Sequence, residues 1–414
     1  MVSGCDGKPA LLGGEPAHSG PWPTWPVHDE REREGVLAVL ESGKWWYGER
    51  VREFEAKFAA FQDARFGISC TNGTAALELA LIGAGIGAGM EVIVPPYTFV
   101  ATATAVLKAN AVPVFADIEL DTLNLDAGAA EAAVTDLTAA VMPVHFAGLP
   151  ADMDRLGELA RQRGLKVIED SAHGWGSKWR GKGCGALGSA GGFSFQLSKN
   201  ITAGEGGMVL TDDPDLADTI RSLSNVGRGK DKPWYEHYLP GGNYRMTEFQ
   251  AAILLAQLGR LPEQTARRMR NAALLNAGLA GIEGLHTLRE DPRANPRSYH
   301  LYGFRVVAEE FGLSRERFIA AMRAEGVPCS PGYPHPLYRN PLFQRRGTGP
   351  AFCPVSCPYY GREMDYTRVN CPNAERACRE VVWLSQSMLL AGEDDMAAIA
   401  AAARKVRHHA AALR

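Results

Sequence analysis

Short apolar runs alternate with amphipathic stretches between residues 66 and 170. The apolar runs predict strands at 66–69, 92–94, 112–115, 139–144 and 166–169. Apolar residues at helical spacing between those runs predict helices at 74–82, 101–109, 127–133 and 153–163. Strands that alternate with helices indicate βαβ units and a largely parallel sheet, and most of these strands are apolar throughout, as strands buried on both faces are. The pattern therefore predicts an α/β fold.

The flanking regions predict the rest of the architecture. Helices are expected at 29–41, which Ser42-Gly43 ends, and at 51–61. A long helix is expected at 247–279, with a break or kink at Pro262. The remainder predicts a strand at 299–307, a helix at 314–324 and a final helix at 392–411. Because 414 residues suit more than one core, we expect an irregular arm at 1–27, a large domain at 28–270 and a smaller C-terminal α/β domain at 271–414.

Composition narrows the class of protein. The net charge is -3, so no basic field favours nucleic acid. We find no signal-peptide pattern and no apolar run long enough to span a bilayer, and we expect a cytoplasmic protein without membrane contact. Four of the eight cysteines lie between Cys353 and Cys378, but at C-x3-C and C-x6-C spacing, without the paired C-x2-C of a zinc knuckle. We expect reduced thiols and no metal.

Two strand ends carry candidate chemistry. At residues 70–77, Cys-Thr-Asn-Gly-Thr-Ala-Ala-Leu, a strand gives way to a helix that begins at a hydroxyl residue. The positive end of a helix dipole and its unpaired N–H groups suit a phosphate, although a plain threonine cap has the same pattern. Asp170 ends the strand at 166–169, at the edge where open α/β sheets bind ligands. It could pair with a protonated pyridine nitrogen or cap the following turn.

Two loops carry the other candidates. Lys199 lies between a strand and a glycine-rich turn that leads into the strand at 208–210. A lysine that forms a Schiff base must lose its proton, which partial burial favours, whereas a lone loop lysine is normally solvated. Residues 241–248, Gly-Gly-Asn-Tyr-Arg-Met-Thr-Glu, enter a helix that Thr247 could cap.

In this order the motifs resemble the pyridoxal-phosphate sugar aminotransferases of the DegT/DnrJ/StrS family, within fold type I. The resemblance runs from about Trp25 to the C-terminal helix. The matching stretches are NGTAAL, PPYTFVATATAV, PVHFAGLPADM, VIEDSAHGWGS, GFSFQLSKNITAGEGGMV and NYRMTEFQAAIL. It implies a large domain with a mostly parallel seven-stranded sheet flanked by helices.

The resemblance also implies site residues. Lys199 would hold pyridoxal 5'-phosphate as a Schiff base (an aldimine) and shuttle protons, in a ping-pong reaction through the pyridoxamine form. The other implied cofactor contacts are Asp170 at the pyridine nitrogen, His173 near the phenolic oxygen, Phe99 on the ring, and Gly73, Thr74, Ala75 and Ser194 at the phosphate. Asn243 would reach the phosphate of the neighbouring subunit, so the implied active site is shared within a homodimer. Weaker candidates for substrate contact are Trp46, Tyr47, Arg245, Tyr333 and His335.

The implied function is amino transfer from L-glutamine or L-glutamate to a keto-cyclitol resembling scyllo-inosose, or to a related keto sugar. The segments at 10–16 and 331–338 look most like the cyclitol branch, which serves antibiotic biosynthesis and includes synthases of aminohydroxybenzoate. Two alternatives stay open: a nucleotide-linked keto sugar as acceptor, and a non-catalytic regulator that binds the cofactor on the same fold.

Overall fold

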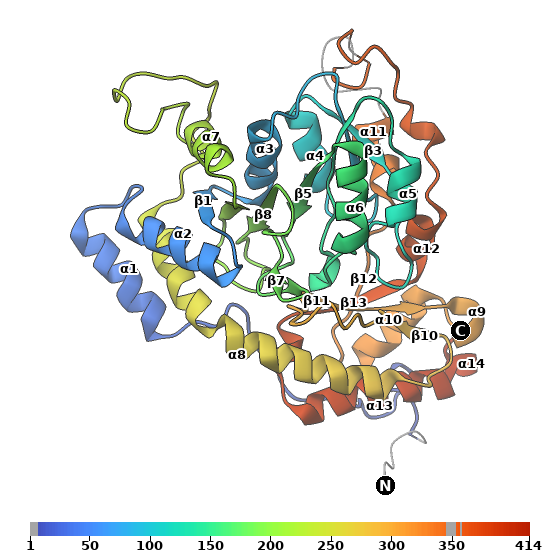
Figure 1. Ribbon diagram of the computed structural model, residues 1–414. Helices are drawn as coiled ribbons and strands as arrows, with labels where there is room; N and C mark the ends of the chain where they lie inside the picture. Colours follow the sequence, from blue (N-terminus) through green and yellow to red (C-terminus); the bar gives the residue numbers. More distant parts are fainter. Residues whose placement is uncertain (1–6, 345–352, 357) are drawn as a thin grey trace.

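The computed structural model describes residues 7–344, 353–356 and 358–414. A seven-stranded sheet forms its centre, in the order β1-β9-β8-β5-β4-β2-β3 (Figure 1). The strands are β1 (Phe66–Cys70), β2 (Glu91–Val94), β3 (Val112–Phe115), β4 (Thr138–Val141), β5 (Lys166–Asp170), β8 (Ala190–Ser194) and β9 (Gly207–Thr211). β9 runs antiparallel to both its neighbours, and the other pairs are parallel. The predicted, mostly parallel seven-stranded sheet is confirmed.

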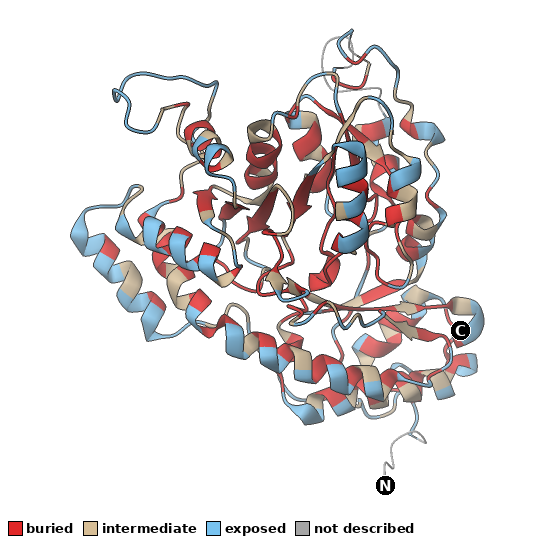
Figure 2. Cartoon of the chain, viewed as in Figure 1, coloured by how far each residue is buried: buried red, intermediate tan, exposed pale blue. Residues whose placement is uncertain are grey.

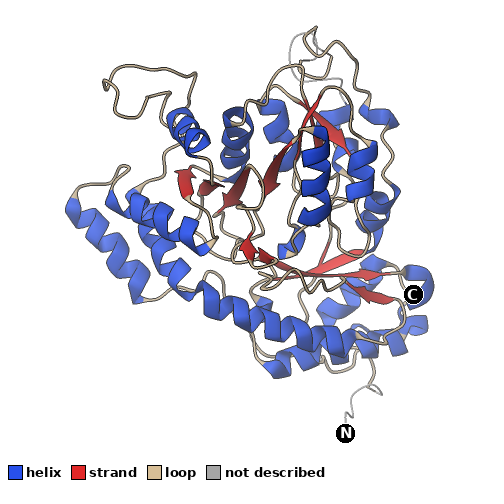
Figure 3. Ribbon diagram, in the orientation of Figure 1, coloured by secondary structure: helices blue, strands red, loops and turns tan. Residues whose placement is uncertain are grey.

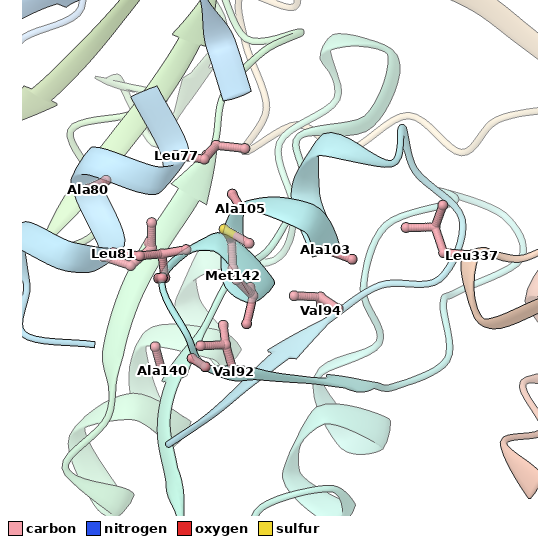
Figure 4. Close-up of a cluster of buried hydrophobic side chains, with 14 of the residues drawn as sticks. Leu77, Ala80, Leu81, Val92, Val94, Ala103, Ala105, Ala140, Met142 and Leu337 are labelled. Atoms are coloured by element: carbon pink, nitrogen blue, oxygen red, sulfur yellow. The ribbon is translucent and has the colours of Figure 1, made fainter. Parts of the chain in front are cut away.

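Helices cover both faces of this sheet (Figure 3). The helices of this part of the chain are α1 (Glu30–Ser42), α2 (Glu49–Phe61), α3 (Gly73–Gly83), α4 (Ala101–Lys108), α5 (Ala127–Ala132), α6 (Met153–Arg163), α7 (Pro214–Ser224) and α8 (Glu248–Leu279), of which α1 packs on α8. Adjacent strand residues point to opposite helical layers. Val92 and Val94 pack with α3 and α4 (Figure 4), whereas Ile93 packs with Leu156 of α6. Both faces of the central strands are therefore buried, as their continuous apolar runs predict.

The long helix α8 contains Pro262 and continues through it, so the predicted break is wrong. Proline removes one intrahelical hydrogen bond, but tertiary packing can hold both halves of a helix in place. Before Pro262, Leu254 and Leu261 pack against α2; after it, Leu275 lies in the same buried cluster as Ile399 of the C-terminal helix α13 (Glu393–His408). The domain boundary predicted at residue 270 falls inside this helix and stays a prediction.

The C-terminal part forms a second, antiparallel sheet in the order β10-β11-β13-β12. Its strands are β10 (Leu285–Thr287), β11 (Leu301–Val306), β12 (Ser330–Pro331) and β13 (Val381–Ser385). The helices here are α9 (Ala308–Phe311), α10 (Arg315–Ala324), α11 (Pro341–Gln344), α12 (Pro372–Glu380), α13 (Glu393–His408) and α14 (Ala410–Leu413). The predicted final helix therefore ends early, and a separate helical turn follows it. A short hairpin, β6 (Lys178–Trp179) with β7 (Lys182–Gly183), completes the strands.

The N-terminal arm is not wholly irregular, contrary to expectation. A 3-10 turn, η1 (Ala10–Leu12), follows Pro9, and similar turns are η2 (Phe146–Gly148), η3 (Leu337–Arg339), η5 (Tyr366–Arg368) and η6 (Met388–Leu390). The carboxylate of Glu325, which is fully buried, accepts hydrogen bonds from the backbone N–H groups of Ala10 and Ala17, each at 2.8 Å. The arm is thus tied to the C-terminal part of the chain.

Burial is concentrated in the central sheet and on the inner faces of the helices (Figure 2). Among the described residues, no helix is both long and apolar enough to cross a bilayer. In the same part of the chain, no three His, Cys, Asp or Glu side chains are grouped as a metal site would require. Cys5 and Cys357 lie outside the described residues.

Candidate active site

A cavity of about 760 Å³ lies at the carboxyl ends of β5 and β8, as the parallel topology predicts. The N-terminal turn of α3, the end of β5, the β8–β9 connection and the start of β11 contribute to its lining, together with β13. Nine of the predicted residues line it: Gly73, Thr74, Ala75, Phe99, Asp170, His173, Ser194, Lys199 and Tyr333. Segments far apart in the sequence therefore meet at one place.

Lys199 lies in the loop between β8 and β9, next to the buried indole of Trp175. Its Nζ is 5.8 Å from the centre of that ring. Burial lowers the pKa of Lys199 to about 8, and the negative charge of Asp170 opposes this shift. A lower pKa increases the fraction of neutral amine near pH 7, which is the nucleophilic form.

Asp170 is the last residue of β5 and is buried. Thr102 Oγ1 donates a hydrogen bond to Asp170 Oδ2 at 2.7 Å, and the Ala172 N–H donates to Oδ1 at 3.2 Å. Burial raises the pKa of Asp170, and these hydrogen bonds and the charge of Lys199 oppose the rise. The carboxylate is therefore fixed in position and would be stabilised by a further cation in the cavity.

The cavity also contains two imidazoles in contact, His173 and His300, with ring centres 4.2 Å apart and ring planes tilted by 36°. Burial lowers the pKa of both rings well below the ordinary value. His173 Nδ1 accepts a hydrogen bond from the Ala147 N–H at 3.3 Å, so the proton of the neutral ring is on Nε2. His173 can thus donate from Nε2, as a contact to a phenolic oxygen requires.

The protonation of His300 follows from its neighbour. Asn200 Nδ2 donates to the Ser298 carbonyl at 2.8 Å, which leaves Asn200 Oδ1 as an acceptor, 3.1 Å from His300 Nδ1. His300 Nδ1 therefore carries the proton, and Nε2 has the free lone pair. His300 is not among the residues predicted from the sequence; the available signal was a polar residue near the start of the mostly apolar strand predicted at 299–307.

The first turn of α3 makes a close approach to β8. A Cβ added to Gly73 would lie 2.6 Å from Ser194 Cβ, so only glycine permits this contact. The helix cap is Asn72, whose Oδ1 accepts from the Ala75 N–H at 2.9 Å, so the alternative interpretation of this motif as a plain threonine cap does not hold. Within the described residues, no acceptor takes the N–H groups of Gly73 and Thr74. These N–H groups and the Ser194 hydroxyl form a cradle suited to an anion.

Five predicted residues do not line this cavity. Trp46, Tyr47 and Arg245 line a separate cavity of about 90 Å³. There Tyr47 donates to Glu55 and accepts from Arg221, while the Arg245 guanidinium lies 5.3 Å from the Trp46 ring and bonds Asn225. These residues lie apart because α1 and α2, which flank residues 46 and 47, pack on α8.

His335 lies outside the cavity as well, although its neighbour Tyr333 is within it. Asn243 is exposed and pairs with Asn225 through the backbone. Its predicted contact with a neighbouring subunit stays a prediction.

Several lining residues were not anticipated. Besides His300, they include Lys108, Trp383 and Gln386. Trp383 and Gln386 come from the C-terminal sheet and the turn after it, whose position over the large sheet is a tertiary effect. The local sequence pattern carries no signal for such a contact. Thr102, whose hydroxyl bonds Asp170, does lie in a helix that the spacing of apolar residues predicts.

Known proteins resemble the chain over nearly its whole length. The sequence profile of the DegT/DnrJ/EryC1/StrS aminotransferase family matches residues 26–362. The 3-amino-5-hydroxybenzoate synthase of Amycolatopsis mediterranei (strain S699) is 38% identical, over 92% of this chain and 95% of that protein. The L-glutamine:2-deoxy-scyllo-inosose aminotransferase of Streptomyces paromomycinus is 38% identical, over 98% of each.

Solved structures agree with this relationship. A crystal structure of 3-amino-5-hydroxybenzoic acid synthase superposes with a TM-score of 0.85 and 37% identity, covering 95% of this chain and 100% of that one. The family profile, the similarity of sequence and the shared fold type I architecture lead to one conclusion. The chain belongs to the DegT/DnrJ/EryC1/StrS aminotransferase family.

Proposed function

We propose that this protein binds pyridoxal 5'-phosphate through Lys199 and transfers an amino group from L-glutamine, or L-glutamate, to a keto-cyclitol. The observation that carries the proposal is the position of Lys199, which shares one cavity with the buried Asp170 carboxylate and the Gly73–Ser194 cradle.

The residues present fit this cofactor. The cradle formed by the α3 turn and Ser194 suits a phosphate, and its glycine leaves space that a Cβ would fill. Asp170 would pair with the pyridine nitrogen, His173 would donate to the phenolic oxygen, and Phe99 would cover the ring. When bound, pyridoxal phosphate supplies an electron sink that stabilises negative charge at the carbon bearing the amino group.

The protein side chains supply proton transfer and orientation. The amine of Lys199, neutral in part near pH 7, accepts a proton at Nζ and returns it. Thr102 and the Ala172 N–H hold the Asp170 carboxylate in position and favour its charged form. His300 offers an acceptor at Nε2 to a hydroxyl or ammonium group of the substrate.

The substrates are inferred from relatives. The relatives named above include an aminotransferase that takes L-glutamine and 2-deoxy-scyllo-inosose. We infer the same donor and class of acceptor here. We also infer a homodimer in which Asn243 reaches the partner's phosphate site, since Asn243 is exposed and does not line the larger cavity of its own chain.

Half-reactions test the proposal. Glutamine or glutamate should convert the bound cofactor to its amino form, with loss of the visible absorbance band. 2-Deoxy-scyllo-inosose should then restore the band faster than a thymidine-diphosphate keto sugar. If only the nucleotide sugar restores the band, the acceptor is a nucleotide-linked keto sugar and not a keto-cyclitol. If no amino donor converts the cofactor, the protein is better explained as a non-catalytic regulator that binds it.

A further inference from the structure

Arg268 of α8 is an unusual buried charge. Its side chain is fully buried, and within the described residues its hydrogen-bond partners are Gln386 and Gln264 rather than a carboxylate. The guanidinium lies 5.8 Å from the centre of the Trp25 ring, and burial lowers its pKa to about 9. A buried cation without a counter-ion is costly, so such a residue favours an anion nearby.

The main partner of Arg268 is Gln386, which lines the cavity. Arg268 Nε donates to Gln386 Oε1 at 3.1 Å, and Nη2 donates to the same oxygen at 2.5 Å. Nε also lies 3.3 Å from the Gln386 backbone oxygen. Because a guanidinium only donates, Oε1 must face Arg268. The amide Nε2 of Gln386 is then the polar group that remains for the cavity, and the positive charge behind it strengthens its N–H as a donor.

We propose that Gln386 Nε2 binds the α-carboxylate of the amino donor, with Arg268 as the positioning residue that orients and polarises the amide. This inference rests on the proposed function and deepens it.

An amide supported by a guanidinium suits a site that takes two unlike substrates in turn. An amino acid brings a carboxylate, whereas a keto-cyclitol brings hydroxyl groups and no charge. The N–H of an amide donates to either one. The field of Arg268 adds attraction for the carboxylate, and the neutral amide between them avoids presenting an unpaired cation to the cyclitol.

The test is Gln386→Glu in the cofactor-loaded protein. The new carboxylate pairs with Arg268 and repels a donor carboxylate, but it still accepts hydrogen bonds from hydroxyl groups. We expect the glutamine concentration for half-maximal donor rate to rise about tenfold to a hundredfold, the range for losing a hydrogen bond to a charged group. The half-maximal concentration of 2-deoxy-scyllo-inosose should change by less than about threefold.

Gln264→Met is the matched control, because it removes the other side-chain partner of Arg268 without placing a new charge beside it. Gln264 Oε1 lies 3.5 Å from Arg268 Nη2, and Gln264 does not line the cavity. The glutamine dependence should stay within about twofold of the wild type, because a polar contact of this length contributes little. Equal changes in both half-reactions of Gln386→Glu, or the same loss in Gln264→Met, would overturn the inference. If wild-type protein fails to react with any amino donor, the proposed function itself is wrong, and this outcome is seen before any variant is made.

Discussion

The hydroxyl of Thr102 offers a sensitive test of how Asp170 works. Thr102→Val keeps the side-chain shape and removes the 2.7 Å hydrogen bond to Asp170 Oδ2, in a place where both residues are buried. A hydrogen bond to a charged group contributes about 1.5–3 kcal/mol, and about 1.4 kcal/mol corresponds to a tenfold change in an equilibrium constant. Loss of this bond should raise the pKa of Asp170 further, in the direction in which burial already shifts it. A less charged Asp170 pairs less well with the pyridine nitrogen.

The assay is titration of cofactor-free protein with pyridoxal phosphate, followed by absorbance. We expect the Kd of Thr102→Val to increase about tenfold to a hundredfold. Thr104→Val is the control, because Thr104 lies on the same helix but bonds only the Ala101 carbonyl. A Thr102→Val protein that binds the cofactor within twofold of the wild type would refute the role given to this hydrogen bond.

The remaining predictions concern charge, space and stability. Because the pKa of Lys199 falls from 10.5 to about 8 on folding, the cofactor-free folded state binds fewer protons between these values, so its stability should rise with pH across that window. Stopped-flow uptake of pyridoxal phosphate should accelerate about tenfold per pH unit below pH 8 and level off above it, and a flat profile would contradict this pKa. Gly73→Val should abolish the close approach to Ser194 and weaken cofactor binding at least about tenfold, measured by the same titration. Glu325→Ala leaves Lys405 buried without its 2.9 Å partner, and urea unfolding should show that the free energy of unfolding falls by about 3–5 kcal/mol. A fall below about 1 kcal/mol would contradict the role of Glu325 as a buried partner of Lys405 and of the N-terminal arm.

Regular patterns made much of the fold predictable. The continuous apolar runs located β1 to β5, and helical spacing located α3 to α6 within about two residues. Pro262 was misleading because local chemistry predicts a break, whereas packing of Leu261 and Leu275 on different helices holds α8 together.

The residues of the candidate site form two groups, those that the strand topology predicts and those that only tertiary packing brings to the cavity. Asp170 ends β5, while Gly73 and Lys199 lie within five residues of the ends of β1 and β8, so the order and direction of the strands are enough to bring them together. Gln386 and His300 approach the cavity only because the C-terminal sheet packs over it. Trp46 carried a plausible aromatic signal, but the helices that flank it place it in another cavity.

The most direct measurement locates the cofactor on the chain. Protein loaded with pyridoxal phosphate is treated with borohydride, which fixes the cofactor to its lysine, then digested and examined by mass spectrometry. The structure predicts a phosphopyridoxyl group on Lys199, whose amine has the lowered pKa. Lys108 also lines the cavity but is paired with Glu78 at 2.6 Å, so it serves as an internal alternative. A label on Lys108, or on no lysine of this cavity, would contradict the account.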